Sequence, residues 1–119
     1  MSTANHKAAS ILRAIAHPER LRLLEALRES EECVCHLTAL LRQRQAYVSQ
    51  QLMLLRQAGL IEDHREGTRI YYRIQDPRVF QVLDAVHALA GEETIKAKRQ
   101  TAAACPCPKC QTSEKRQAG

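Results

Sequence analysis

Apolar side chains recur every three or four residues along the first half of the chain, and this spacing predicts a run of helices. The first helix ends before Pro18, whose ring suits the first turn of a second helix. A short third helix opens near Cys33, and a fourth stops at Gly59, a natural C-terminal cap. The apolar positions of these helices are Ala8, Ile11, Leu12 and Ile15; Leu21, Leu23, Leu24 and Leu27; Leu37, Leu40 and Leu41; and Val48, Leu52 and Leu55. The charged residues of the second helix that are expected to face water are Arg20, Arg22, Glu25 and Arg28.

The pattern then becomes extended before it turns helical again. Residues 60–61 and 70–74 are predicted to be two strands, with Glu66 and Gly67 at the turn between them. Asp76 and Pro77 begin a last helix. The apolar stripe of this helix is Val79, Val82, Leu83, Val86 and Leu89. The order helix, helix, short helix, helix, hairpin, helix predicts a mainly α protein with a β-hairpin wing (α+β), which is the layout of a winged helix-turn-helix.

The chain has 119 residues, of which 45% are apolar, and this fits one small domain with a single core. We expect that domain to span residues 1–100. Residues 101–119 are rich in Ala, Pro, Gln, Ser and charge without apolar periodicity, and are predicted to form a flexible tail. The apolar stretches are too short to span a membrane, and the N-terminus does not resemble a secretion signal, so a cytoplasmic location is expected.

The positive charge of the chain is concentrated in its middle. The formal net charge is +5. Residues 33–73 contain six Arg and no Lys against three acidic residues. Arg binds phosphate and guanine with two parallel hydrogen bonds, so this segment favours a nucleic acid as partner. The alternative is a solvated face that happens to be rich in Arg. No constellation of acid, base and nucleophile indicates an enzyme.

The fourth helix, from Gln45 to Arg56, is the predicted recognition helix. When its apolar stripe faces the core, its polar side chains are available to the major groove of DNA, where Gln can bind adenine. On the hairpin, Arg65, Thr68 and Arg69 flank Gly67 and suit contact with phosphate. The residues predicted to contact DNA are Arg44, Gln45, Tyr47, Ser49, Gln50, Gln51, Arg56, Arg65 and Arg69.

Several segments in register resemble one known family. They are residues 17–24, the Cys-Val-Cys-His-Leu run at 33–37, and residues 48–61 and 65–74. Together they resemble the ArsR/SmtB family of metal-responsive repressors over about residues 8–95. The resemblance implies a homodimer whose first and last helices pack across a two-fold axis. It also implies binding to an imperfect inverted repeat in double-stranded operator DNA and release when a metal ion binds.

The chain departs from the family at two positions that concern DNA. Arg44-Gln45-Ala46 stands where the family commonly has Ser-Gln-Pro, and Gln51 stands where it commonly has His. Gln51 can still bond a base edge or a phosphate, so these departures leave the operator sequence open.

The five cysteines form a group of two and a group of three. In a chain without a secretory leader, they indicate free thiolates or a metal site rather than a disulfide framework. Cys33 and Cys35 are two residues apart, so on an ideal helix their side chains would diverge by about 200° and converge only at the helix start. Two sulfurs are too few for three-coordinate arsenite or antimonite, or for four-coordinate cadmium or zinc.

The resemblance suggests how such a site is completed. The Cys-Val-Cys run is similar to the thiolate site of arsenic-, cadmium- and lead-responsive members, but Thr38 stands where arsenic sensors have a third Cys. The first 32 residues contain no Cys that could serve instead. Our hypothesis is that the tail folds back, within or across the dimer, so that the metal-ligand candidates are Cys33, Cys35, Cys105, Cys107 and Cys110. As(III) or Sb(III) is favoured as inducer, with Cd(II), Pb(II) or Zn(II) as the other candidates.

Two histidines are given other roles. His36 occupies a place where the family often has Asp, and it is expected to face solvent. Asp84 and His87 have the wrong spacing for the zinc site of the family's last helix, so His87 is assigned to the dimer surface.

The predicted function is therefore that of a metal(loid)-responsive repressor, and other readings of the thiols stay open. One alternative keeps the DNA-binding scaffold and makes the cysteines a redox or persulfide sensor. Another is a thiol-based metal carrier. Cys33 and Cys35 could also be small buried apolar residues, and the tail cluster could bind metal alone or have no regulatory role.

Overall fold

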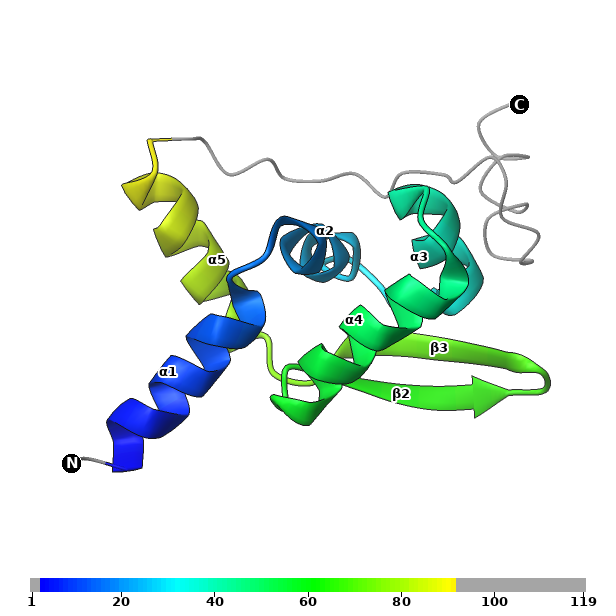
Figure 1. Ribbon diagram of the computed structural model, residues 1–119, viewed down its shortest axis with the longest axis horizontal. Coiled ribbons are helices and arrows are strands. Elements are labelled where there is room, and N and C mark those ends of the chain that lie inside the picture. The colour runs from blue at the N-terminus through cyan, green and yellow to red at the C-terminus, as the bar shows by residue number, and fades with distance from the viewer. Residues whose placement is uncertain (1–2, 92–119) are drawn as a thin grey trace.

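The computed structural model describes residues 3–91, and its elements follow the predicted order with one addition (Figure 1). The elements are α1 (Thr3–Ile15), α2 (Pro18–Ala26), β1 (Glu32–Cys33), α3 (Val34–Leu41), α4 (Gln45–Gln57), β2 (Ile61–Glu66), β3 (Arg69–Ile74) and α5 (Arg78–Leu89). The addition is the two-residue strand β1. The predicted fold class, a mainly α protein with a hairpin wing, is confirmed.

The three strands form one antiparallel sheet in the order β1-β3-β2. The hairpin register runs from the pair Ile61 and Ile74 to the pair Glu66 and Arg69. Gly67 lies in the turn with a φ of 60°, a left-handed conformation that glycine adopts without a Cβ clash. On the other edge of β3, Cys33 pairs with Tyr71. The sheet therefore ties the first cysteine to the middle of the hairpin, where Tyr71 also pairs with His64.

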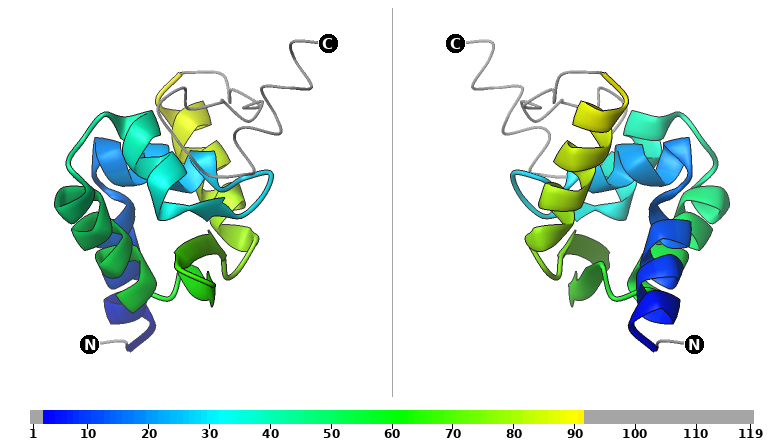
Figure 2. Two further views of the ribbon diagram at one scale, coloured as in Figure 1. Left: turned by 90° about the vertical axis from the view of Figure 1, so that its right-hand side faces the viewer. Right: turned by 90° about the vertical axis from the view of Figure 1, so that its left-hand side faces the viewer.

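The core is aliphatic and is built around α2, which lies between the other helices (Figure 2). Each predicted helix contributes at least part of its apolar stripe to this core, as expected from the helical spacing. The fully buried side chains include Leu23 and Leu24 of α2, Leu37 of α3, Val48, Leu52 and Leu55 of α4, and Leu83 of α5. The core thus fixes the rotation of α4, which decides which of its side chains face outward.

Apolar side chains remain exposed on α1 and α5, which lie at the end of the molecule opposite the wing tip (Figure 1). The predicted stripe of α5 is only partly buried. Val79 and Leu83 are in the core, whereas Val86 is 43% exposed and Leu89 is 89% exposed. Ile11 and Leu12 are exposed on α1. Among residues 3–91, no helix is long and apolar enough to cross a membrane.

The start of α5 is fixed by a short-range ion pair. Oδ1 of Asp76 accepts a hydrogen bond from the backbone N–H of Arg78 at 3.0 Å. The Arg78 guanidinium also donates to both carboxylate oxygens. These bonds favour the charged carboxylate and lower the pKa of Asp76 to about 2. The predicted helix start at residues 76–77 is therefore confirmed.

Arg28 joins α2 to α5, which corrects the expectation that it and Glu25 face water. Both side chains are partly buried. The guanidinium donates to Glu25 at 2.8 and 2.9 Å and to Asp84 at 2.9 Å, and it lies over the ring of Phe80. The bonds to Glu25 raise the pKa of Arg28. Only long-range partners could reveal this role, because Asp84 and Phe80 lie far from Arg28 in the sequence.

Replacing Arg28 by alanine should lower the free energy of unfolding by about 2 kcal/mol, because it removes charge-assisted hydrogen bonds at a partly buried site. Urea unfolding measures this change. Arg73→Ala is the matched control, because Arg73 pairs with Glu62 at an exposed site where ion pairs contribute about 0–1 kcal/mol. Equal losses in the two variants would contradict a special role for Arg28.

Candidate DNA interface and thiol site

Helices α3 and α4 form a helix-turn-helix with a sharp connection. Arg42 caps the C-terminus of α3 in the left-handed conformation, with a φ of 54°. Arg44 then adopts an extended conformation at the N-cap of α4. The chain thus reverses direction within residues 42–44 and places basic side chains at the N-terminal end of α4. That end carries the positive pole of the helix dipole, which favours an anionic partner.

Helix α4 has one buried and one exposed face. Val48, Leu52 and Leu55 are fully buried. The side chains exposed on the other face are those of Gln45, Gln50, Met53 and Arg56. Gln side chains pair with adenine, and a Met methyl group can contact the methyl group of thymine. The exposed face is therefore suited to base readout in a major groove.

The nine predicted DNA-contacting residues are not equally placed. Those exposed to solvent are Arg44, Gln45, Gln50, Arg56 and Arg65. Those partly buried are Tyr47, Ser49 and Arg69. Gln51 is only 7% exposed, and its Oε1 accepts a hydrogen bond from Arg20 at 2.8 Å. The amide oxygen of Gln51 is thus directed to the protein interior, while Arg56 also forms an ion pair with Asp63 at 3.3 Å.

Near its tip, the wing directs the basic side chain of Arg65 to solvent and that of Arg69 to a sulfur atom. Arg65 is exposed near the end of β2. Arg69 begins β3, and its Nη1 donates to Sγ of Cys35 at 3.5 Å. Thr68, in the turn, is exposed between them. The wing is therefore suited to phosphate contact and touches the cysteine pair as well.

Cys33 and Cys35 converge at the start of α3, where they form a disulfide. Cys33 is the N-cap, and its backbone is extended rather than helical. The divergence of an ideal helix therefore does not apply, and the two Cα atoms lie 5.3 Å apart. Sγ of Cys33 also accepts a hydrogen bond from the N–H of His36 at 3.2 Å. The pair converges as expected for a helix start, but it is bonded rather than free.

A buried acid and base lie next to the cysteine pair. Glu32 and His36 are 0% and 1% exposed, so the expectation that His36 faces solvent is wrong. Nε2 of His36 lies 3.5 Å from Oε2 of Glu32, and Ser30 donates to Oε1 of the same carboxylate at 3.2 Å. Helix α3, which carries His36, contacts strands β1 and β3 of the sheet.

The described residues supply only part of a soft-metal site. Among residues 3–91 there is no group of three or more His, Cys, Asp or Glu that could hold a metal ion. Thr38, at the place of a third thiol, donates instead to the carbonyl of Val34 at 2.7 Å. Reduced Cys33 and Cys35 would provide two thiolates. The further candidates Cys105, Cys107 and Cys110 lie outside the described residues, so the five-cysteine site stays a prediction.

Two outcomes at this interface were not anticipated from the sequence. Met53 is exposed on the outer face of α4. Helical spacing could have indicated this position, because Met53 follows Gln50 by three residues and so lies on the same face. Arg20 was expected to face water but bonds Gln51. A signal was available, since Arg20 precedes Leu23 and Leu24 by three and four residues and so lies on the buried stripe of α2.

The helix-turn-helix, the wing and the exposed face of α4 define a winged helix-turn-helix regulator. The family model described as "Bacterial regulatory protein, arsR family" matches residues 17–63. A biofilm growth-associated repressor of Agrobacterium fabrum is 38% identical over 89 residues, or 73% of this chain and 76% of the relative. The chain therefore belongs to the arsR family of bacterial regulatory proteins.

Two further comparisons agree with this assignment. The transcriptional repressor SmtB of Mycobacterium tuberculosis is 43% identical over 89 residues, which are 74% of this chain and 65% of SmtB. Among solved structures, the homodimeric winged helix-turn-helix DNA-binding domain of Mb0332 from Mycobacterium bovis superposes with a TM-score of 0.68 at 29% identity. That match covers 76% of this chain and 88% of the Mb0332 domain.

Proposed function

We propose that this protein is a metal(loid)-responsive transcriptional repressor. As a homodimer it binds double-stranded operator DNA with an imperfect inverted repeat, and it is released when a thiophilic ion binds cysteine thiolates. As(III) or Sb(III) is the favoured inducer, followed by Cd(II) and Pb(II), with Zn(II) as a further candidate. The family assignment supports a repressor that responds to metal ions and acts in the cytoplasm without enzymatic activity.

One observation carries the link between the thiols and DNA. Cys33 and Cys35 lie at the junction of three elements: strand β1, helix α3, which leads into α4, and the wing through Arg69. An ion bound at these sulfurs would be held by the same stretch of backbone that orients α4 and the wing. A change of ligation at the sulfurs can therefore shift α4 and the wing relative to each other.

The DNA contacts that we propose are assigned from the exposure of each side chain to solvent. Gln45, Gln50 and Met53 of α4 face the bases, with Ser49 and Tyr47 at the edge of that face. The residues proposed to contact phosphates are Arg44, Arg56, Arg65 and Arg69. Exposed Ile11, Leu12, Val86 and Leu89 support a dimer built from α1 and α5, because large apolar side chains left exposed on two helices are typical of a surface that a partner covers.

The proposed ion site needs reduced sulfurs and at least one more ligand. Reduction of the Cys33–Cys35 bond gives two thiolates, and the arrangement at the N-terminus of α3 beside Arg69 favours negative charge on sulfur. Three-coordinate As(III) then requires one thiolate of the tail, from Cys105, Cys107 or Cys110. Because thiolate ligation releases protons, inducer affinity is expected to fall at acidic pH.

The test is release of DNA by a panel of ions under full reduction. Fluorescence anisotropy with an operator duplex, in the presence of a phosphine reductant, should show DNA affinity falling when As(III) is added. The same titration with Sb(III), Cd(II), Pb(II) and Zn(II) ranks the inducers. Binding that no ion changes would contradict metal(loid) sensing, and a protein that binds no DNA would contradict the repressor itself.

The disulfide favours a second candidate function, a redox-sensing repressor. Joining Cys33 to Cys35 releases two electrons and two protons, which hydrogen peroxide can accept to form two water molecules. In this case peroxide should change DNA affinity without any metal, and a reductant should reverse the change. An ion response under full reduction, with no effect of peroxide, would favour the metal sensor instead.

A further inference from the structure

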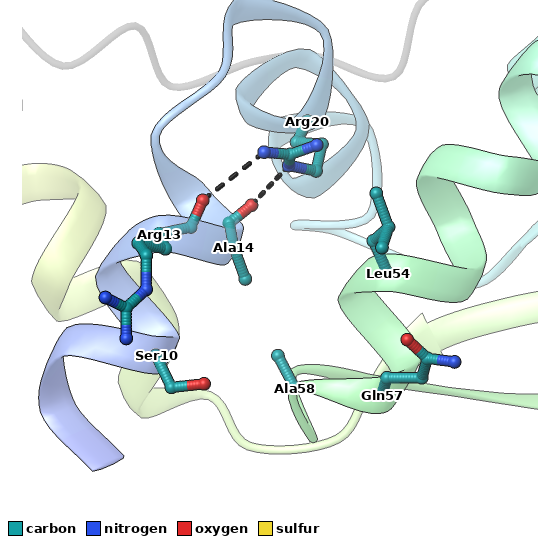
Figure 3. A pocket seen from close by; sticks show the side chains of 7 residues that line it. All are labelled: Ser10, Arg13, Ala14, Arg20, Leu54, Gln57 and Ala58. Carbon is teal, nitrogen blue, oxygen red and sulfur yellow. Dashed lines mark hydrogen bonds between the residues drawn. The ribbon is translucent and has the colours of Figure 1, made fainter. Parts of the chain in front are cut away.

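One arginine of α2 contacts both the end of α1 and the middle of α4. Nε of Arg20 donates to the carbonyl of Ala14 at 2.5 Å, and Nη2 donates to the carbonyl of Arg13 at 3.3 Å. Nη1 donates to Oε1 of Gln51 at 2.8 Å. Figure 3 shows the Arg20 guanidinium above the last turn of α1, with two of these bonds drawn. The planar guanidinium thus connects three helices with one rigid group.

The bonds to α1 satisfy carbonyls that the helix leaves open. Helix α1 ends at Ile15, so the carbonyls of Arg13 and Ala14 belong to its last turn. His17 N–H, which would continue the helix by bonding Arg13, bonds the carbonyl of Ile15 instead. A cation at this end also complements the negative pole of the helix dipole. Arg20 therefore acts as the C-terminal cap of α1.

The bond to α4 uses a side chain on the buried face of that helix. Gln51 lies between Val48 and Leu52 in the sequence of α4, and all three are buried. An amide held against a guanidinium at such a site cannot rotate freely, because breaking the bond would leave polar groups without their partner. The link therefore constrains the rotation and position of α4 relative to α1.

Helices α1 and α4 contact each other directly at only part of their length, and an open cleft lies between part of α1 and the end of α4. The cleft has a volume of about 280 Å³ and is lined by Ser10, Arg13 and Ala14 of α1, Arg20 of α2, and Leu54, Gln57 and Ala58 at the end of α4 (Figure 3). Side chains do not fill this space, so packing across the cleft itself contributes little to fixing the angle between the helices. The Arg20 side chain lies at the upper end of the cleft in this view, with its two bonds to the last turn of α1 drawn.

We infer that Arg20 is a positioning residue for DNA recognition, which sets the angle between α1 and α4 through Gln51. In a dimer held together through α1 and α5, this angle sets the separation and rotation of the two α4 helices. Gln51 then acts on DNA through Arg20 and not by reading a base. The inference rests on the proposed DNA binding of a dimer, but it does not depend on the inducer or on the cysteines.

The test is selectivity for the spacing of half-sites. Wild-type protein first selects a duplex from a random pool, and that duplex is then lengthened or shortened by one base pair between its half-sites. Each base pair shifts a half-site by about 3.4 Å and about 35°. The wild type should lose about tenfold in affinity, measured by fluorescence anisotropy. Arg20→Lys keeps the charge but cannot reach all three acceptors. The affinity that this variant loses on the duplex with altered spacing should therefore be only about twofold.

Gln51 provides the reciprocal variants and Arg22 the control. Gln51→Leu should reduce the spacing preference as Arg20→Lys does, and the double variant should lose no more than either single variant. Gln51→Glu should retain the wild-type preference, because a carboxylate accepts from the guanidinium at least as well. Arg22→Lys should leave the preference unchanged, because Arg22 bonds only the carbonyl of Leu40 among the described contacts.

Several results would overturn the inference. One is that Arg20→Lys and Gln51→Leu keep the wild-type spacing preference and only lower the Tm. Another is that the losses of spacing preference in the two single variants add up in the double variant. A change in the preferred base at one position after Gln51→Leu would show direct readout by Gln51. A wild type without any spacing preference would remove the role of the angle. A wild type that selects no duplex would instead overturn the DNA-binding function on which the inference rests.

Discussion

Cys35→Ser is expected to bind operator DNA with the affinity of the wild type and to keep that affinity when As(III) is added. Serine preserves the size of the side chain but cannot ligate a thiophilic ion. Cys33→Ser should behave likewise, because serine is a good N-cap residue and keeps the acceptor for the N–H of His36. Allosteric coupling is commonly about 5- to 150-fold, so the wild-type release should fall to less than about twofold. Anisotropy titrations under full reduction measure both affinities.

Thr38→Cys gives the opposite change at the same site. Residues 35 and 38 are three apart on α3 and so share a face, and a thiol at 38 would supply a third sulfur beside the pair. This variant should bind As(III) even when Cys105, Cys107 and Cys110 are all replaced by serine. In the chain with Thr38, the same triple replacement should abolish As(III) binding. If the triple serine variant with Thr38 keeps its As(III) affinity, the tail cysteines are not ligands. If As(III) releases Cys35→Ser from DNA as it releases the wild type, the pair of Cys33 and Cys35 is not the ion site.

The sequence predicted the order of the elements because each helix has a continuous apolar stripe. The stripe of α4 is the clearest case, since Val48, Leu52 and Leu55 are all fully buried. Strand β1 was missed because two residues are too few to show an alternating pattern. It exists through its pairing with β3, a contact between segments about 40 residues apart.

The polar parts of the site were harder to predict, because their partners are distant in the sequence. Arg20 and Arg28 are residues of the kind that a solvated helix face carries. In the structure, however, Arg20 bonds Gln51 of α4 and Arg28 bonds Asp84 of α5. His36 is buried on a helix that contacts the sheet, and the local pattern around it does not indicate this burial. Sequence spacing identifies the face of a helix, but it does not identify the neighbour that a charged side chain meets.

The wing allows phosphate contact and thiol contact to be separated. Arg65→Ala and Arg69→Ala should each lower DNA affinity by about tenfold at low salt and reduce the slope of log K against log[salt] by about one, because each removes one phosphate contact. The loss should be similar for all DNA sequences, since phosphates carry no sequence information. Anisotropy titrations at several salt concentrations, with the selected duplex and with an unrelated one, measure both quantities.

Only Arg69→Ala should also alter the chemistry of the cysteines. Nη1 of Arg69 donates to Sγ of Cys35, whereas Arg65 lies exposed at the end of β2. Removing that guanidinium takes away a positive charge that favours the thiolate, so alkylation of reduced Cys35 by iodoacetamide should slow. Arg65→Ala is the control and should react at the wild-type rate. If both variants react like the wild type, Arg69 does not affect the reactivity of Cys35. Coupling between the thiols and DNA must then run through α3 or through the pairing of β1 with β3.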